Sequence, residues 1–258
     1  MSLQGRHALV GGASKGIGRA TAFALAAQGA QLTLMVRHVA AFDALLPELR
    51  AAGAPAVRAI GVDLDDEASV TAALPQILDA GDVHVFVHNS GGPPAGPMLT
   101  APDAQLLTAF RRTVLSGQQL VRALLPGMQR AAFGRIVNVL STSVKEPLPN
   151  LGVGNVVRGA MGAWAKTLAH ELPPGVTINN VLPGYTATER LDEIAAAAAS
   201  RSGRDPAAIR AEWSTHVPEG RIAAADEIAA VIAFLCSPAA SYVRGQSIAV
   251  DGGRSRGI

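Results

Sequence analysis

Short apolar runs alternate with longer helical segments along almost the whole chain, and this alternation limits the possible folds strongly. Seven runs are rich in Val, Ile and Leu and are bounded by turn-forming residues, which is typical of buried strands. They are His7–Val10, Gln31–Val36, Val57–Leu64, Val83–Val87, Arg135–Leu140, Thr177–Leu182 and Ser247–Val250. Helical patterns separate them, at Ile17–Gln28, Ala40–Ala52, Asp66–Leu78, Asp103–Arg130, Asn155–Glu171 and Asp226–Cys236. The alternation predicts an α/β fold: a Rossmann-type, doubly wound parallel sheet of about seven strands with helices on both faces.

Length and composition agree with one large folded domain over residues 1–258. The chain has 49% hydrophobic and 16% charged residues, which excludes a disordered protein. The most apolar stretches are far shorter than the roughly 20 residues that a membrane span needs. The first residues contain no apolar signal core, so we expect a cytoplasmic protein with no membrane partner.

Cysteine content and charge exclude further classes. Cys236 is the single cysteine, so we expect no intrachain disulfide, no thiolate metal site and no bound metal; within its apolar helix it resembles a buried, inert thiol. Twenty-two basic residues nearly balance 20 acidic ones, and aromatic residues make up only 4%. Neither a basic face nor stacking platforms for nucleic acid are therefore expected.

Residues 186–220 interrupt the alternation. This segment contains an alanine run at Ala195–Ala199, many charges, and the turn-forming sequence Ser202–Pro206. Two interpretations are equally compatible with it: a helical flap over a substrate cleft, or a solvated insertion.

The glycine-rich segment Gly11–Gly18 follows the first predicted strand and opens the first predicted helix. Glycine permits positive φ angles and lets backbone N–H groups approach a ligand. The helix N-terminus adds unpaired donors and a partial positive charge, which suit a diphosphate. A glycine triplet alone is a weak signal, but this position between strand and helix favours a dinucleotide site over a simple tight turn.

With that segment in place, the chain resembles the short-chain dehydrogenase/reductase family over nearly its whole length, and in particular its 3-oxoacyl-[acyl carrier protein] reductase-like members. The family's glycine loop has a threonine where this chain has Gly11. The matching motifs are Gly11–Gly18, Asp63, His88–Gly91, Pro183–Thr188, Gly220–Glu227 and Gly245–Gly253.

The resemblance implies a role for several groups in cofactor binding. Asp63 matches the residue that contacts adenine, and the segment from Pro183 to Thr188 matches the one that holds the nicotinamide carboxamide. The expected cofactor-binding residues are Gly12, Ser14, Lys15, Gly16, Ile17, Gly18, Arg37, Asp63, Leu64, Asn89, Gly91, Arg158, Pro183, Gly184, Thr186 and Thr188.

Charge at the end of the second strand indicates which dinucleotide binds. An acidic residue there would favour a free ribose 2′-hydroxyl, but the strand ends in Val36-Arg37-His38, and Lys15 lies in the glycine loop. Two cations attract a 2′-phosphate, and arginine can bind it with two donors. We therefore expect NADP(H) in preference to NAD(H); the alternative is that both are ordinary solvated charges.

The family's catalytic Asn-Ser-Tyr-Lys tetrad is largely absent. The serine position is occupied by Ser141, but the other three positions correspond to Thr113, Gly154 and Arg158. Arg158 could still hold the ribose, but it cannot relay a proton as lysine does, because its pKa is too high. Gly154 is expected to leave a ring-sized space beside the nicotinamide.

Few groups could replace the missing tyrosine. Ser141 is a catalytic candidate, although capping of the turn after its strand is an equally good role. Tyr185 directly follows Pro183-Gly184 and should face the cleft, as a substitute acid or, more in keeping with its position, as a lining residue. Tyr242 resembles a packing residue, and we expect His88 to contact a helix.

Three functions are compatible with these features. The first is an NADP(H)-dependent oxidoreductase that acts on a small carbonyl, alcohol or quinone-like substrate at a modified site. The second is a catalytically silent dinucleotide-binding protein that serves as a sensor or assembly subunit. The third is a lyase or isomerase on the same scaffold, which the intact cofactor motifs disfavour. The resemblance also implies a homo-oligomer, either a tetramer or a dimer.

Overall fold

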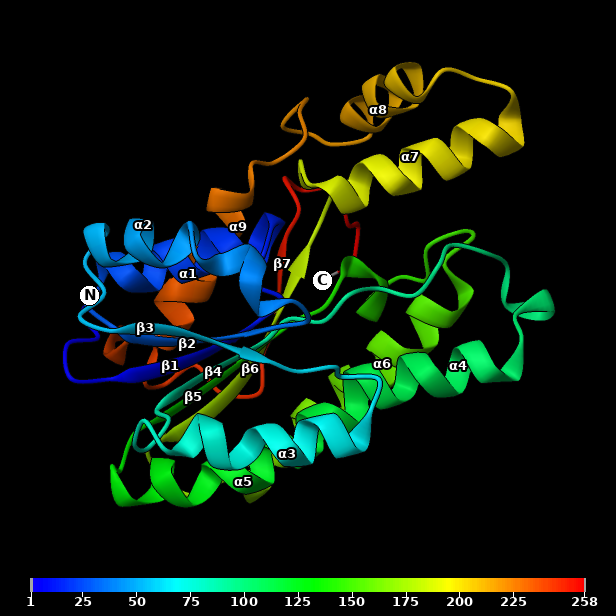
Figure 1. The fold of residues 1–258 in the computed structure, drawn as a ribbon. Coiled ribbons are helices and arrows are strands. Elements are labelled where there is room, and N and C mark those ends of the chain that lie inside the picture. Colours follow the sequence, from blue (N-terminus) through cyan, green and yellow to red (C-terminus); the bar gives the residue numbers. More distant parts are fainter. Residues whose placement is uncertain (1, 258) are drawn as a thin grey trace.

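The computed structural model describes residues 2–257 and contains one seven-stranded sheet (Figure 1). All paired strands run parallel, in the order β3-β2-β1-β4-β5-β6-β7. This is the doubly wound Rossmann-type sheet that the alternation predicted. The strands are β1 (His7–Gly11), β2 (Gln31–Val36), β3 (Val57–Gly61), β4 (Val85–His88), β5 (Gly134–Val139), β6 (Val176–Pro183) and β7 (Ser247–Val250).

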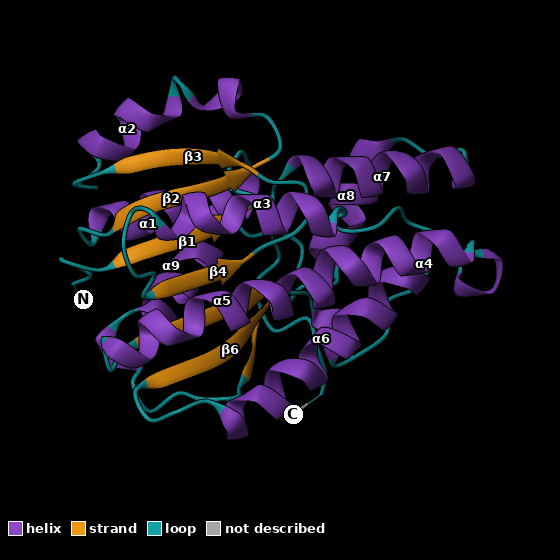
Figure 2. Cartoon of the chain, turned by 60° about the horizontal axis from the view of Figure 1, so that its bottom comes forward, coloured by secondary structure: helices purple, strands orange, loops and turns teal. Residues whose placement is uncertain are grey.

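Helices cover both faces of the sheet (Figure 2). One apolar core lies between the sheet and α1 (Gly16–Ala27), α2 (Leu45–Ala51) and α9 (Ala225–Cys236). The opposite core lies against α3 (Glu67–Leu78), α5 (Ser116–Arg130) and α6 (Gly152–Glu171). Because both faces are covered, the central strands are apolar on both sides, which explains their continuous runs of Val, Ile and Leu.

Two helix predictions need correction. The predicted helix Ala40–Ala52 is divided into a 3₁₀ turn at Val39–Phe42 and the short helix α2. The predicted helix Asp103–Arg130 consists of α4 (Asp103–Phe110), a π-helical turn at Arg111–Leu115, and α5. A π turn has hydrogen bonds between residues five apart, one more than in an α-helix, and this difference cannot be detected in a hydrophobic pattern. The third predicted strand also ends earlier, at Gly61.

Residues 186–220 form a helical pair beyond the carboxyl ends of the strands (Figure 1). The pair consists of α7 (Glu189–Ser202) and α8 (Pro206–Thr215). Gly203, at φ +66°, ends α7, and Asp205 caps α8 through its side chain. Ion pairs of Arg204 with Glu212 and of Arg210 with Asp192 add polar contacts on this pair.

The structure also bears on the single cysteine and on membrane-spanning helices. Cys236 is buried, and burial raises the pKa of its thiol, as expected of an inert cysteine. Within residues 2–257, no helix is both long enough and apolar enough to cross a membrane.

His7 begins β1 in a buried position and makes the fold sensitive to acid. Its Nε2 atom is 2.8 Å from the Thr33 hydroxyl of β2, and its ring is 3% exposed. Burial, reinforced by the positive charge of Arg58, lowers the pKa of His7 to about 4. The folded protein therefore holds this imidazole neutral at pH values where an unfolded chain would protonate it.

We predict that the free energy of unfolding falls as the pH decreases from about 6.5 to about 4, because only the unfolded state binds this proton in that window. Denaturant titrations at several pH values measure the slope. His7→Gln should reduce the slope without abolishing it, because the pKa of buried His88 is lowered too, whereas His170→Gln, at an exposed position on α6, should leave the slope unchanged. An unchanged slope in His7→Gln would contradict the assignment.

Candidate active site

The turn between β1 and α1 has the geometry of a dinucleotide-binding loop. Gly12 and Gly16 have φ angles of +58° and +54°, a region that favours glycine. Gly18 lies directly under the turn, because a Cβ atom there would lie 2.1 Å from the Gly12 carbonyl oxygen. The backbone of the first turn of α1 is therefore free to face a ligand at the carboxyl edge of the sheet.

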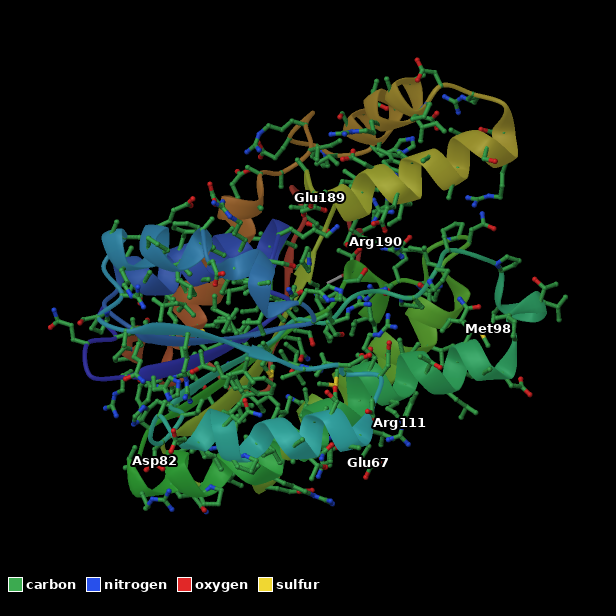
Figure 3. The ribbon with its side chains drawn as sticks, in the orientation of Figure 1. Glu67, Asp82, Met98, Arg111, Glu189 and Arg190 are labelled. Atoms are coloured by element: carbon green, nitrogen blue, oxygen red, sulfur yellow. The ribbon has the colours of Figure 1, made fainter. Side chains whose placement is uncertain are left out.

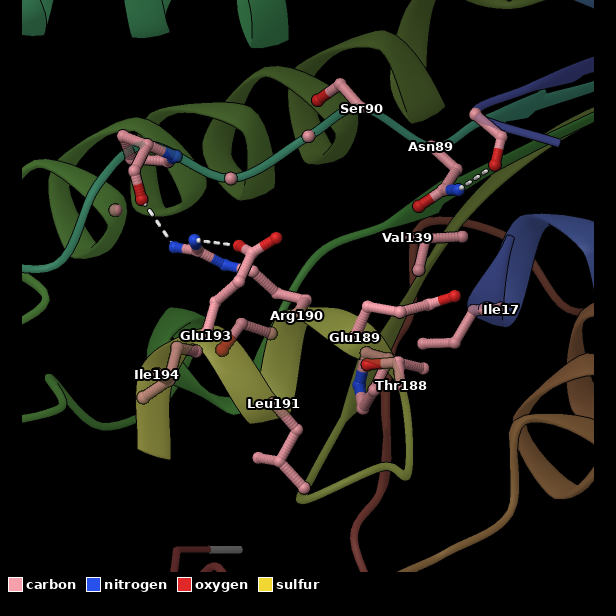
Figure 4. Close-up of a pocket in the computed structure, with 18 of the residues that line it drawn as sticks. Ile17, Asn89, Ser90, Val139, Thr188, Glu189, Arg190, Leu191, Glu193 and Ile194 are labelled. Carbon is pink, nitrogen blue, oxygen red and sulfur yellow. Dashed lines mark hydrogen bonds and ion pairs between the residues drawn. The ribbon is translucent and has the colours of Figure 1, made fainter. Parts of the chain in front are cut away.

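Asn89, just after β4, fixes this turn to the centre of the sheet. Its Nδ2 atom donates to the carbonyl oxygen of Gly11 at 3.2 Å. It also donates to the carbonyl oxygen of Gly12 at 3.4 Å (Figure 4). A Cβ atom at Gly12 would lie 2.8 Å from that Nδ2, so the close approach requires glycine. One amide side chain thus joins two of the predicted motifs.

A cavity of about 860 Å³ opens at the carboxyl edge, between the sheet and α7. It brings together every predicted site residue except Gly18, which acts from beneath the turn: Gly12, Ser14, Lys15, Gly16, Ile17, Arg37, Asp63, Leu64, Asn89, Gly91, Ser141, Arg158, Pro183, Gly184, Tyr185, Thr186 and Thr188. The cavity also contains groups that sequence reasoning missed, notably Arg112, Arg190, Trp213 and Arg254.

Arg37, just after β2, and Lys15, in the glycine turn, both line this cavity and are exposed. Over residues 2–257, neither cation lies in an ion pair with an acidic side chain. By contrast, Arg112 is paired with Asp65 through two short bonds of 2.6 and 2.5 Å. The charges of Arg37 and Lys15 therefore remain available for an anionic group.

The predicted helix contact of His88 is present. Its Nε2 atom lies 2.8 Å from the carbonyl oxygen of Thr113, within the π turn. Burial lowers the pKa of His88, so the imidazole is neutral and donates to this carbonyl. The backbone oxygen of Thr113 is thus occupied by a buried ring.

Arg158 fills space that the missing tyrosine was expected to leave empty. A Cβ atom on Gly154 would lie 2.7 Å from Nη1 of Arg158, one helical turn further along α6. The guanidinium therefore folds back over Gly154, and the expected ring-sized space is partly occupied. Burial lowers the pKa of Arg158 to about 10, with a further contribution from nearby Arg190, so the group stays charged at neutral pH.

Ser141 and Tyr185 occupy different parts of the cavity. The Ser141 hydroxyl accepts a bond of 3.1 Å from the Ser143 backbone N–H, which leaves its own hydrogen free to donate. The Tyr185 ring stacks on Trp213 of α8, with centroids 5.0 Å apart, and Arg254 lies 4.8 Å from its centroid on a C-terminal segment. Tyr185 therefore connects the α7–α8 pair to the sheet.

The fold and the glycine turn together are typical of dinucleotide-binding proteins of the Rossmann type. The family described as Enoyl-(Acyl carrier protein) reductase matches residues 12–255. The short-chain reductase protein NovJ of Streptomyces niveus is 34% identical over 96% of this chain and 93% of its own length. The 3-oxoacyl-[acyl-carrier-protein] reductase FabG of Pseudomonas aeruginosa is 32% identical over 98% of both chains. The chain therefore belongs to the short-chain dehydrogenase/reductase family.

Solved structures agree with this assignment. The L-sorbose reductase of Gluconobacter frateurii, complexed with NADPH and L-sorbose, superposes with a TM-score of 0.93 at 27% identity and covers 100% of this chain and 99% of its own. YwfH, an NADPH-dependent reductase involved in bacilysin biosynthesis, gives a TM-score of 0.91 at 26% identity, with coverage of 98% and 99%.

Proposed function

We propose that this protein is an NADP(H)-dependent oxidoreductase that acts on a carbonyl, alcohol or quinone-like substrate at a site without the usual tyrosine and lysine. The observation that carries the proposal is the single cavity in which the glycine turn, Asp63, Asn89 and the Pro183–Thr188 segment meet. The absence of side chains at Gly12 and Gly18 lets this turn pack closely and supports the proposal, because the first turn of α1 then borders the cavity.

The residues of the cavity fit a dinucleotide phosphate. Backbone N–H groups at the start of α1 would hold the diphosphate, and Asp63 with Leu64 would border the adenine. Thr186, Thr188 and the Pro183-Gly184 backbone would orient the nicotinamide ring. When bound, the cofactor would supply or accept the hydride.

The substrate oxygen needs a donor in such a reaction, and Ser141 is the proposed one. Among residues 2–257 its hydroxyl accepts from the Ser143 backbone N–H and donates to no protein group, so its hydrogen is available. Arg158 is a fixed positive charge: with a pKa of about 10 it is a poor proton donor at neutral pH. The proton that accompanies the hydride then comes from water, so substrates that need little acid assistance suit the site.

The α7–α8 pair is the proposed substrate lid of a single 1–258 domain. It borders the cavity through Glu189, Leu191 and Ile194, and Trp213 contacts Tyr185. A homo-oligomer is also proposed, supported by exposed apolar side chains near the packed helices α4 and α6; these include Leu107 and Val156.

A single-turnover experiment tests the oxidoreductase proposal. Stoichiometric protein is incubated with NADPH deuterated at the transferred position and a panel of carbonyls and quinones, and mass spectrometry follows deuterium. Deuterium in a product is expected, even at a rate about 10²–10⁴-fold below that of an enzyme with a positioned acid. Tight NADPH binding without transfer would instead support the silent dinucleotide-binding protein, which the loss of three tetrad residues favours.

Arg37 provides the test of cofactor choice. We predict that Arg37→Gln weakens NADPH binding by about 10- to 100-fold, because a charged hydrogen bond to the 2′-phosphate is lost. NADH affinity should change by less than about threefold. Fluorescence titration measures both, and Arg19→Gln, an exposed arginine paired with Glu48 on α2, is the matched control. Equal losses for the two cofactors would refute a 2′-phosphate contact.

Tyr185 is proposed as a lining residue, because its ring is stacked on Trp213. Tyr185→Phe keeps the stack and should preserve kcat within about threefold, whereas Tyr185→Ala should raise KM by removing the contact with the lid. Steady-state kinetics on a substrate found in the deuterium experiment separate the two effects. A fall in kcat of about 100-fold in Tyr185→Phe would make this hydroxyl the acid.

A further inference from the structure

Arg158 carries a charge that the protein does not neutralise. Among residues 2–257, its guanidinium forms no ion pair within 4.0 Å and donates no hydrogen bond to another protein group. It nevertheless lies in the cavity, against Gly154 on one side and Gly92 on the other: a Cβ atom at Gly92 would be 2.8 Å from Nη2. A cation withdrawn from water without a partner is unfavourable unless a ligand supplies the counter-charge.

A second guanidinium lies at the same place. Arg190, in the first turn of α7, approaches the loop after β4 (Figures 3 and 4). Its Nη2 donates to the Pro93 carbonyl oxygen at 2.5 Å, and its Nη1 pairs with Glu193 at 3.1 Å. Its Nε and Nη2 atoms would each lie 3.5 Å from a Cβ on Gly92. Two guanidinium groups therefore border one residue that has no side chain.

The pair is not balanced by its surroundings. Glu193 is engaged with Arg190 at a side chain that is 57% exposed, which limits how far it compensates a second cation. Around the whole cavity, cationic side chains outnumber acidic ones by seven to four. Like charges this close repel each other, and an anion between them would remove that repulsion.

We infer that Arg158 and Arg190 bind a carboxylate of the substrate above Gly92, so that the substrate is a keto acid, a hydroxy acid or a similar carbonyl compound with an acid group. This inference rests on the proposed oxidoreductase function. Arginine presents planar pairs of donors that match a carboxylate, and the absence of a side chain at Gly92 leaves room for one. The reacting carbonyl of the same molecule would then lie in the cavity that Ser141 also lines.

The position of the pair also assigns it a role in closure. Arg158 belongs to α6 on the sheet side, whereas Arg190 belongs to α7, the first helix of the lid. A bound carboxylate would connect the two helices and add to the hydrogen bond that Arg190 already donates to the Pro93 carbonyl oxygen. A neutral substrate could not make this connection, so the acid group would serve both recognition and exclusion of water.

The test measures binding, which does not depend on turnover. Pyruvate, levulinate and 2-oxo-4-phenylbutyrate, each with its methyl ester, are titrated calorimetrically into protein saturated with NADP⁺. At least one acid should bind about tenfold or more tightly than its ester. Arg158→Gln and Arg190→Gln should reduce this preference to about threefold or less, while Arg158→Lys should retain part of it. The matched control is Arg111→Gln, a half-buried arginine that does not line the cavity and is paired with Glu67 at 2.8 Å (Figure 3).

The outcomes separate the two proposals. If no acid binds more tightly than its methyl ester at concentrations up to about 20 mM, the inference is overturned. It is also overturned if Arg158→Gln weakens NADPH binding and leaves the preference for acids intact, because the guanidinium would then serve the cofactor. Selective acid binding that depends on both arginines, without deuterium transfer in the earlier experiment, would uphold this site and overturn the oxidoreductase proposal.

Discussion

The close approach of the β1–α1 turn to Asn89 is the constraint on which the rest of the site depends. Asn89 reaches two consecutive carbonyl oxygens of the turn, at Gly11 and Gly12, and the absence of side chains at Gly12 and Gly18 makes this geometry possible. Since β1 and β4 are neighbours in the sheet, this contact holds the carboxyl ends of the central strands together. The segments after β2, β5 and β6 can then converge on one cavity.

Much of the fold follows from the sequence because it depends on patterns that extend over many residues. The central strands are buried on both faces, so their apolar runs are continuous, and right-handed connections limit the possible strand orders. The π turn at Arg111–Leu115 leaves no such pattern. It is recognisable only in the structure, where the Thr113 carbonyl oxygen meets His88. That bond depends on a histidine and a helix segment 25 positions apart, which no local propensity records.

The sequence predicted which residues line the candidate site, but it did not predict the directions of their long side chains. Backbone-determined groups, such as Gly12 and Asn89, lie where their motifs place them. The direction of a long side chain is different, because it depends on which neighbours leave room for it. Arg158 turns toward Gly154 and Gly92, two positions without side chains on separate elements, and Arg190 arrives from the α7 segment that matched no readable motif. Neither orientation could be deduced from the motif spacing alone.

Gly154 and Arg158 are sterically coupled. A side chain at position 154 would begin 2.7 Å from the Arg158 guanidinium, so this rotamer requires the glycine. A lysine at position 158 would be harder to keep charged under the same burial, whereas arginine retains its proton with a pKa of about 10. The proposed site therefore has a permanent cation beside Gly154, a group that suits the binding of an anion better than the transfer of a proton.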